Sequence, residues 1–231
     1  MIKVLLWDID GTVLNFEKAE FHSMQDAFNK YGLGTFTNEY KEKYTKINTS
    51  YWKRLERNEV SKQEVLLGRF RDFFNEVGIE FSDYAAFNLD FQLGLGDHVF
   101  FNDSAFELIK DFKQDFRQYA VTNGTYTAQH KKLATSHLND VLDGVFISDV
   151  LKVEKPNRAF FEQVLNTIGS YSLDEILIIG DSLTSDIQGG NNIGIKTCFY
   201  DPKHTSANLD NYHIDYHISD LNELREILKI N

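Results

Sequence analysis

The sequence predicts an α/β protein in which a doubly wound, mostly parallel sheet is interrupted by a helical insert. Short apolar runs rich in β-branched and aromatic residues recur along the chain, which is typical of strands buried on both faces. Amphipathic helical patterns separate most of these runs, as in parallel βαβ units. One stretch, 16–96, contains helical patterns alone and is too long for an ordinary crossover.

The expected strands are apolar runs that end near Gly, Asp, Thr, Asn or Ser. Helical patterns lie between them: "DSAFELIKDFKQ" is expected to begin at a capping Asp103. "KPNRAFFEQVLNTIG" opens with Pro156 near the first helical turn and closes near Gly169. This alternation predicts a Rossmann-like core. Its strands are expected at residues 3–8, 117–124, 144–148, 175–181, 195–200 and 215–219.

The insert is expected to contain four amphipathic helices and to form a domain of its own. The first pattern ends at Gly32, and the third begins with a capping box formed by Ser61 and Glu64. Gly94 and Gly96 stop the fourth pattern. We therefore expect two domains: a core from residues 1–15 and 97–231, and a helical cap from residues 16–96.

Composition limits the possible function classes. With 42% hydrophobic and 14% aromatic residues, the chain can bury a proper core, so intrinsic disorder is not expected. The net charge of −11 disfavours a nucleic-acid polymer as partner, because such binding neutralises phosphates with Lys and Arg. Cys198 is the single cysteine, which favours a cytoplasmic location. The N-terminal apolar run is too short and acidic for a signal peptide or membrane span. The oligomeric state stays open.

Residues that can carry chemistry follow the expected strands. In an open parallel sheet, ligands bind beyond the carboxyl ends of the strands, so these side chains should share one edge. The residues are, in chain order, Asp8, Asp10, Gly11 and Thr12; Thr122, Asn123 and Gly124; Lys155; and Asp181 with Asp186.

The charges at this edge predict a metal ion and a phosphoryl substrate. Asp8, Asp181 and Asp186, ionised together, would place three negative charges within a few ångströms of one another. Carboxylate oxygens are hard ligands that select Mg²⁺. Mg²⁺ together with Lys155 would bring the total charge to zero, so that a phosphate dianion could approach. A small-molecule phosphate monoester is therefore the expected partner.

The spacing of Asp8 and Asp10 suits two carboxylates that divide the work. One can attack phosphorus and form an aspartyl-phosphate. The other can protonate the leaving oxygen and later take a proton from water, if the environment separates their pKa values. Thr122 and the following backbone N–H groups of Asn123 and Gly124 can hold phosphoryl oxygens.

The motifs "DIDGT", "TNG", Lys155 before Pro156, and "GDSLTSD" resemble, in this order, those of the haloacid dehalogenase superfamily. The resemblance covers the whole chain. It implies that Asp8 is the nucleophile and Asp10 the general acid and base, and that Thr122 and Asn123 bind phosphate. Lys155 would steady the nucleophile and the phosphoryl charge. Glu154, directly before Lys155, departs from the small or apolar residue usual in the superfamily.

The same resemblance implies a ligand set for Mg²⁺. Asp8, Asp181 and the backbone carbonyl of Asp10 would hold the ion, and Asp186 would support it through water or Lys155. The insert resembles the cap of the phosphatases in this superfamily. Its stretch 47–74 is similar to the corresponding part of YjjG/YfnB-type 5′-nucleotidases. That likeness implies hydrolysis of nucleoside 5′-monophosphates, with pyrimidine or non-standard bases prominent.

Several aromatic and polar residues are candidates for contact with the base or sugar. Tyr44, Asn48, Trp52 and Arg69 lie in the insert, where the tyrosine also fits a packing stripe. Phe16, just past the nucleophile loop, is placed to line the mouth of the pocket. Three alternatives stay open: a phosphoglycolate phosphatase, a sugar phosphatase, and a β-phosphoglucomutase-like phosphomutase that shares all four motifs.

Overall fold

A computed structural model describes residues 1–205 and 208–229. The chain divides into two compact units, Met1–Phe16 with Val99–Asn231, and Glu17–His98. Phe16 thus belongs to the first unit and His98 to the second, whereas the sequence pattern placed the boundaries at residues 16 and 97. Within the part of the chain that is described, no helix combines the length and apolar character needed to cross a membrane.

The first unit is built on a six-stranded sheet with the order β3-β2-β1-β4-β5-β6, and every neighbouring pair is parallel. This confirms the predicted fold class. Because β1 lies between β2 and β4, the strand order reverses there, and ligands bind at such a switch point. The strands are β1 (Val4–Trp7), β2 (Arg117–Thr122), β3 (Gly144–Ile147), β4 (Ile176–Gly180), β5 (Lys196–Tyr200) and β6 (Tyr216–Ile218).

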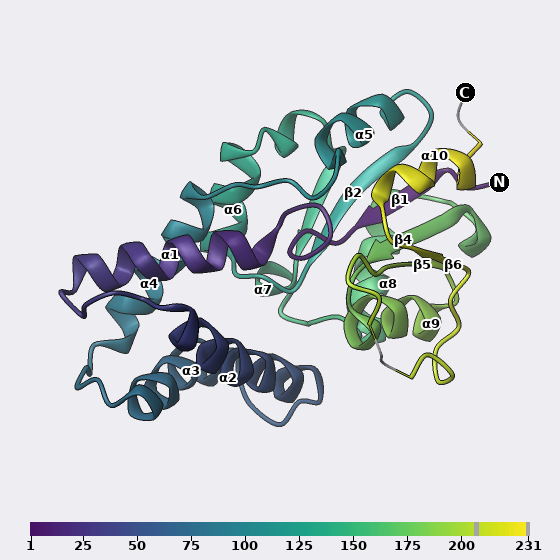
Figure 1. Cartoon of the computed structure of the whole chain (residues 1–231). Helices are drawn as coiled ribbons and strands as arrows, with labels where there is room; N and C mark the ends of the chain where they lie inside the picture. Colours follow the sequence, from purple (N-terminus) through teal and green to yellow (C-terminus); the bar gives the residue numbers. More distant parts are fainter. Residues whose placement is uncertain (206–207, 230–231) are drawn as a thin grey trace. The chain divides into compact units, whose positions relative to one another are not determined.

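Helices cover both faces of the sheet (Figure 1). Successive residues of β1 point to opposite faces, as strand geometry requires. Leu5 and Trp7 pack in a cluster with residues of α5 and α10, whereas Val4 and Leu6 pack in a cluster with residues of α8 and α9. The helices of this unit are α5 (Ala105–Phe112), α6 (Tyr126–Thr135), α7 (Ser148–Leu151), α8 (Arg158–Ile168), α9 (Gln188–Ile193) and α10 (Leu224–Ile227).

One expected helix cap is wrong. The N-cap of α5 is Ser104, without a side-chain capping bond. The carboxylate of Asp103 instead accepts hydrogen bonds from the Tyr200 hydroxyl and the Leu221 backbone N–H, both at 2.9 Å. Asp103 therefore ties the start of α5 to the end of β5 and to a short helical turn near the C-terminus.

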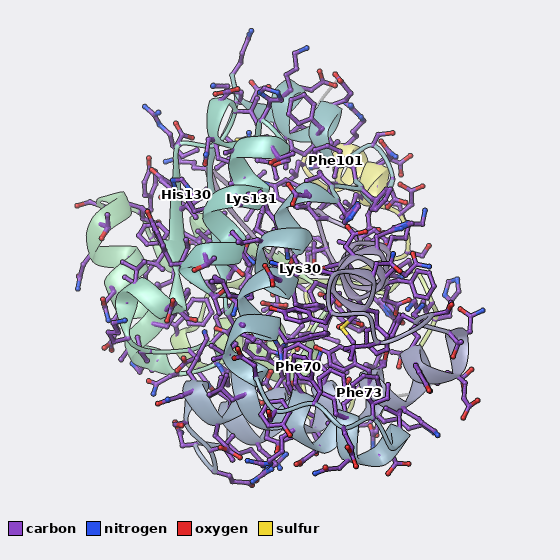
Figure 2. The ribbon with its side chains drawn as sticks, turned by 90° about the vertical axis from the view of Figure 1, so that its left-hand side faces the viewer. Lys30, Phe70, Phe73, Phe101, His130 and Lys131 are labelled. Carbon is purple, nitrogen blue, oxygen red and sulfur yellow. The ribbon has the colours of Figure 1, made fainter. Side chains whose placement is uncertain are left out.

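The second unit is helical and has a core of its own. The Ser61 hydroxyl accepts from the Glu64 backbone N–H, which is one of the two hydrogen bonds of the predicted capping box, while Glu64 Oε1 accepts from Arg71. The C-cap of α3 is Gly78. Phe70 and Phe73 of α3 (Figure 2) are fully buried, and Phe70 stacks on Tyr44 with ring centroids 5.5 Å apart. Its helices are α1 (Phe16–Lys30), α2 (Asn38–Glu56), α3 (Lys62–Val77) and α4 (Tyr84–Asp97).

Candidate active site

The loop after β1 is held in one conformation by backbone and side-chain contacts. The N–H of Asp8 continues the sheet by donating to the Ile179 carbonyl, and the N–H of Gly11 donates to the Leu14 carbonyl. Gly11 has φ +106°, and a Cβ there would lie 2.4 Å from Asp181 Oδ2. Only glycine combines this backbone conformation with so close an approach.

Asn102, which sequence reasoning did not single out, holds the same loop from the segment that follows the insert. Its side-chain amide donates to the carbonyls of Gly11 and Thr12, both at 2.9 Å. Its backbone N–H donates to the Val13 carbonyl at 3.0 Å, and Leu14 forms an isolated bridge with Phe101. The segment that returns from the insert thus pairs with the segment that leaves for it.

Lys155 lies at the centre of the site with 1% of its surface exposed. Its Nζ donates to Asp8 Oδ1 at 2.8 Å, Asp186 Oδ1 at 2.6 Å and the Val121 carbonyl at 2.8 Å. Burial alone would lower the pKa of Lys155, but the charges of Asp186 and Asp8 outweigh it and raise the pKa above its usual value. The lysine therefore stays charged.

Asn123 positions Lys155 through the backbone. The Asn123 side chain accepts from the Lys155 N–H and donates to the Lys155 carbonyl, both at 2.8 Å. Next to it, Thr122 is almost fully buried, and its hydroxyl accepts from the Gly124 N–H at 3.0 Å. The "TNG" segment thus connects the end of β2 to the loop that carries Lys155 through these hydrogen bonds.

Three carboxylates meet at this edge. Asp8, Asp181 and Asp186 can each offer one oxygen atom such that all three lie within 4.8 Å of one another. Burial raises the pKa of Asp8 well above its usual value, Lys155 opposes the shift, and Asp186 adds to it. Although Asp181 is exposed, crowding by protein atoms and the charge of Asp186 raise its pKa to about 7. Both pKa shifts reflect first the burial of a charged carboxylate and then the repulsion between neighbouring carboxylates, and a bound cation would offset both effects.

The donor set fits a hard divalent cation. Asp8 Oδ2 is buried and has no hydrogen-bond partner among the described residues, so one oxygen of the trio is uncommitted. Thr12 orients Asp181, because its hydroxyl accepts from the Asp181 N–H at 3.0 Å and donates to Asp181 Oδ1 at 3.2 Å. Asp186 Oδ2 accepts from the Ser182 N–H at 3.2 Å, at the start of a π-helix, Leu183–Ile187. Such turns are frequent at functional sites.

Asp10 faces a different part of the site. Its Oδ2 accepts from Gln129 Nε2 at 2.6 Å and its Oδ1 from Lys132 Nζ at 2.5 Å. Both partners come from α6, and the ring centroid of Phe16 lies 5.0 Å from Lys132 Nζ. Sequence reasoning missed Gln129 and Lys132. The available signal was their spacing of three residues on the helix that follows "TNG".

The candidates in the insert bond to one another within the helical unit. Asn48 Oδ1 accepts from Trp52 Nε1 and from an Arg69 amino group, both at 3.0 Å. Asn48 also donates to Glu20, and Arg69 donates to Asn88. Asn48 and Arg69 are buried, as is Tyr44. A contact of these residues with substrate stays a prediction.

Comparison with known proteins agrees with this geometry. Residues 2–194 match the sequence model of the family described as "haloacid dehalogenase-like hydrolase". The chain therefore belongs to that family and is an enzyme of the hydrolase class. It is 34% identical over 228 residues to YfnB of Bacillus subtilis, named as a HAD-hydrolase, covering 99% of this chain and 96% of YfnB. The crystal structure of YfnB bound to magnesium matches with a TM-score of 0.93 over 99% of both chains.

Two further relatives carry names that state an activity. Pyrimidine 5′-nucleotidase PynA of Streptococcus pneumoniae is 37% identical over 203 residues, which cover 87% of this chain and 85% of PynA. Pyrimidine 5′-nucleotidase YjjG of Escherichia coli is 26% identical over 224 residues, which cover 97% of this chain and 96% of YjjG. The likeness to YjjG therefore includes the helical insert, and the likeness to PynA includes at least most of it.

Proposed function

We propose that this enzyme is a Mg²⁺-dependent phosphoric monoester hydrolase that removes phosphate from nucleoside 5′-monophosphates, with pyrimidine or non-standard bases preferred. The observation that carries the chemistry is the contrast between the two carboxylates of the first loop. Asp8 Oδ2 has no hydrogen-bond partner within residues 1–205 and 208–229, whereas both oxygens of Asp10 accept hydrogen bonds. This contrast supports Asp8 as the nucleophile and Asp10 as the acid and base. The names of the relatives PynA and YjjG support the substrate class.

The reaction proceeds in two displacements at phosphorus. In the first, an Asp8 oxygen forms a bond to phosphorus, the bond to the nucleoside oxygen breaks, and Asp10 transfers a proton to that leaving oxygen. In the second, water attacks the aspartyl-phosphate, Asp10 takes a proton from the water, and the bond between Asp8 and phosphorus breaks. Lys155 offsets the negative charge of the Asp8 carboxylate before the attack, since its Nζ lies 2.8 Å from Asp8 Oδ1, and offsets phosphoryl charge while the aspartyl-phosphate exists.

Asp8, Asp181 and the backbone carbonyl of Asp10 would hold Mg²⁺, with Asp186 bound to Lys155 beside them. When bound, the ion supplies positive charge that lets an anionic ester approach the carboxylates. The magnesium-bound structure of YfnB supports this choice of ion. Thr122, Asn123 and Gly124 are placed at the adjacent strand end, where phosphoryl oxygens are expected. A cytoplasmic location stays a prediction from composition.

The test is phosphate release by the purified protein with Mg²⁺. The panel contains pyrimidine and purine nucleoside 5′-monophosphates, phosphoglycolate, a hexose phosphate and p-nitrophenyl phosphate. We expect the highest kcat/KM for a pyrimidine or non-standard nucleotide, and loss of activity in EDTA that Mg²⁺ restores. A higher kcat/KM for phosphoglycolate or the sugar phosphate would overturn the substrate assignment. Conversion of a sugar phosphate to its isomer would indicate a phosphomutase.

The nucleophile is tested separately by Asp8→Asn. We expect turnover to fall by at least about a thousandfold, because the amide cannot form the covalent intermediate. Asp140→Asn is the matched control, since Asp140 has an exposed side chain on the same unit. Normal turnover in Asp8→Asn with Mg²⁺ present would remove Asp8 from the role of nucleophile.

A further inference from the structure

The Asp10 carboxylate is contacted by two side chains that the proposed chemistry does not by itself require. Gln129 and Lys132 contact both of its oxygens, although they come from α6, more than a hundred residues further along the chain. Gln129 is fully buried, and Lys132 has 2% of its surface exposed. Lysine and glutamine seldom lie so deep without a specific partner. Their burial therefore calls for a reason at this site.

The start of α6 sets the direction of these two side chains. Thr125 caps the helix by accepting from the Ala128 N–H, and the Gln129 N–H donates to the Thr125 carbonyl. Residues three apart on a helix lie on one face, so Gln129 and Lys132 point the same way. The position of the cap, directly after "TNG", thus fixes which residues of α6 reach Asp10.

Gly124 leaves the room that Gln129 occupies. A Cβ at Gly124 would lie 2.2 Å from Gln129 Nε2, closer than any real contact. Phe16 lies on another side, with its ring centroid 5.0 Å from Lys132 Nζ, an arrangement that favours the charged lysine. Gly124 and Phe16 therefore adjoin the two side chains that contact Asp10.

The contact also has an energetic cost that the fold alone does not explain. With its Nε2 directed at Asp10, Gln129 leaves its buried Oε1 without a hydrogen-bond partner in the described part of the chain. A buried acceptor without a hydrogen bond destabilises the fold, because its interaction with water is lost and not replaced. Such a cost is typical of sites where geometry serves function.

We propose that Gln129 and Lys132 are positioning residues, which hold the Asp10 carboxylate in the orientation that proton transfer requires. This inference rests on the proposed function, because it concerns the proton that Asp10 gives to the leaving oxygen. Two donors, one on each oxygen, restrict rotation of the carboxylate about both of its side-chain bonds. A proton donor displaced by about 1 Å can lose a large part of its effect.

The test compares leaving groups. Expulsion of a nucleoside alkoxide needs a proton, whereas p-nitrophenolate is a weak base that leaves without one. The quantity measured is kcat/KM, which reports the steps up to expulsion of the leaving group. For Lys132→Met and Gln129→Leu, we expect it to fall at least about tenfold with a nucleoside monophosphate and less than about threefold with p-nitrophenyl phosphate. Lys131→Met, at the adjacent position of α6 (Figure 2), is the control with the same loss of charge and should leave both values unchanged.

A double-mutant cycle shows whether the two residues act through Asp10. In an Asp10→Asn background, Lys132→Met should cause no further loss of kcat/KM with the nucleotide, because the group it positions is gone. Thermal unfolding checks that each variant is folded. If Lys132→Met is not folded, the cycle is measured with Gln129→Leu instead. Equal losses with both leaving groups, additive losses with Asp10→Asn, or no loss at all would overturn the proposal.

Failure of the substrate assignment gives a different result. If the wild-type enzyme prefers another phosphate monoester, the comparison is repeated with a simple alkyl phosphate, since the reasoning needs only an alkoxide leaving group. A selective loss there supports the positioning role while the nucleotidase proposal fails. A uniform loss there overturns the positioning role whatever the natural substrate is.

Discussion

Replacing Lys155 by methionine should expose how strongly the site depends on one buried charge. Its Nζ makes three hydrogen bonds of 2.6–2.8 Å, two of them to the carboxylates of Asp8 and Asp186. Removing one partner of a buried ion pair costs roughly 3–5 kcal/mol, because it leaves uncompensated charge. For a chain of this size, that loss corresponds to a decrease in Tm of about 6–20 °C.

The two tryptophans of the chain allow a clean assay. Trp7 is fully buried in β1, directly before Asp8, and Trp52 lies in the other unit. In a Trp52→Phe background, urea unfolding followed by fluorescence therefore reports the first unit alone. Lys152→Met is the control, since Lys152 is exposed on the same segment and the substitution removes the same charge. It should change the free energy of unfolding by less than about 0.5 kcal/mol.

The pH dependence separates charge from packing. The folded-state pKa of Asp8 lies above its unfolded value, so this group reduces stability as pH rises through that folded pKa. Removing Lys155 raises the folded pKa further, so the cost of the substitution should be larger at pH 8 than at pH 5. A loss below about 1 kcal/mol at pH 8 would refute the electrostatic reasoning. A loss that is equal at both pH values would assign the effect to packing.

Three other predictions concern the loop, the metal and the insert. Gly11→Ala should lower activity at least about a hundredfold, since its Cβ would lie 2.4 Å from Asp181 Oδ2 and displace that carboxylate. Gly34→Ala is the control for backbone strain, because φ is +83° there and a Cβ would meet no non-adjacent atom of the described residues within 4 Å. Equal activity of the two variants would refute the steric argument. Because burial and the charge of Asp186 raise the folded pKa of Asp181 to about 7, the protein without metal should lose stability as pH rises from about 4 to 7. Mg²⁺ should raise Tm more at pH 8 than at pH 5.5, since the carboxylates must be ionised to bind it. A larger rise in Tm at pH 5.5 would contradict a carboxylate site. Trp52→Ala should raise KM for a nucleotide more than for p-nitrophenyl phosphate, and equal effects would argue against contact with the nucleoside.

Much of the fold and of the central site could be predicted from the sequence. Strands buried on both faces leave continuous apolar runs, and parallel pairing places their carboxyl ends at one edge. From the sequence alone, that rule predicted that Asp8, Asp181, Asp186 and Lys155 lie close together, and the structure places them so. It works directly for Asp8 and Asp181, because each is the first residue after its strand. Asp186 lies in the π-helix after β4, and Lys155 follows α7 and is positioned by Asn123, so these two residues also depend on the loops that carry them.

The parts that could not be predicted depend on helix phase or on distant contacts. Lys132 stands in the polar run "HKK", where a solvated lysine is the usual interpretation. Only the exact start of α6 turns it toward Asp10. Asp103 has the local pattern of a helix cap, but its partners Tyr200 and Leu221 lie about a hundred residues away. Local patterns carry no information about such pairs.

The two buried lysines, Lys132 and Lys155, each form ion pairs with different carboxylates of the site. Lys155 contacts Asp8 and Asp186, while Lys132 contacts Asp10, so the two carboxylates of the first loop do not share a cation. With Asp181 included, four carboxylates and two lysines leave a net charge of −2 if all are ionised. A divalent cation would neutralise that charge, and it would do so on the Asp8 side, where the uncommitted oxygen lies. Because Asp10 already has its own counter-charge in Lys132, loss of the metal should change the electrostatics around Asp8 far more than those around Asp10. In the proposed reaction, the nucleophile Asp8 and the proton carrier Asp10 would therefore each contact a different lysine.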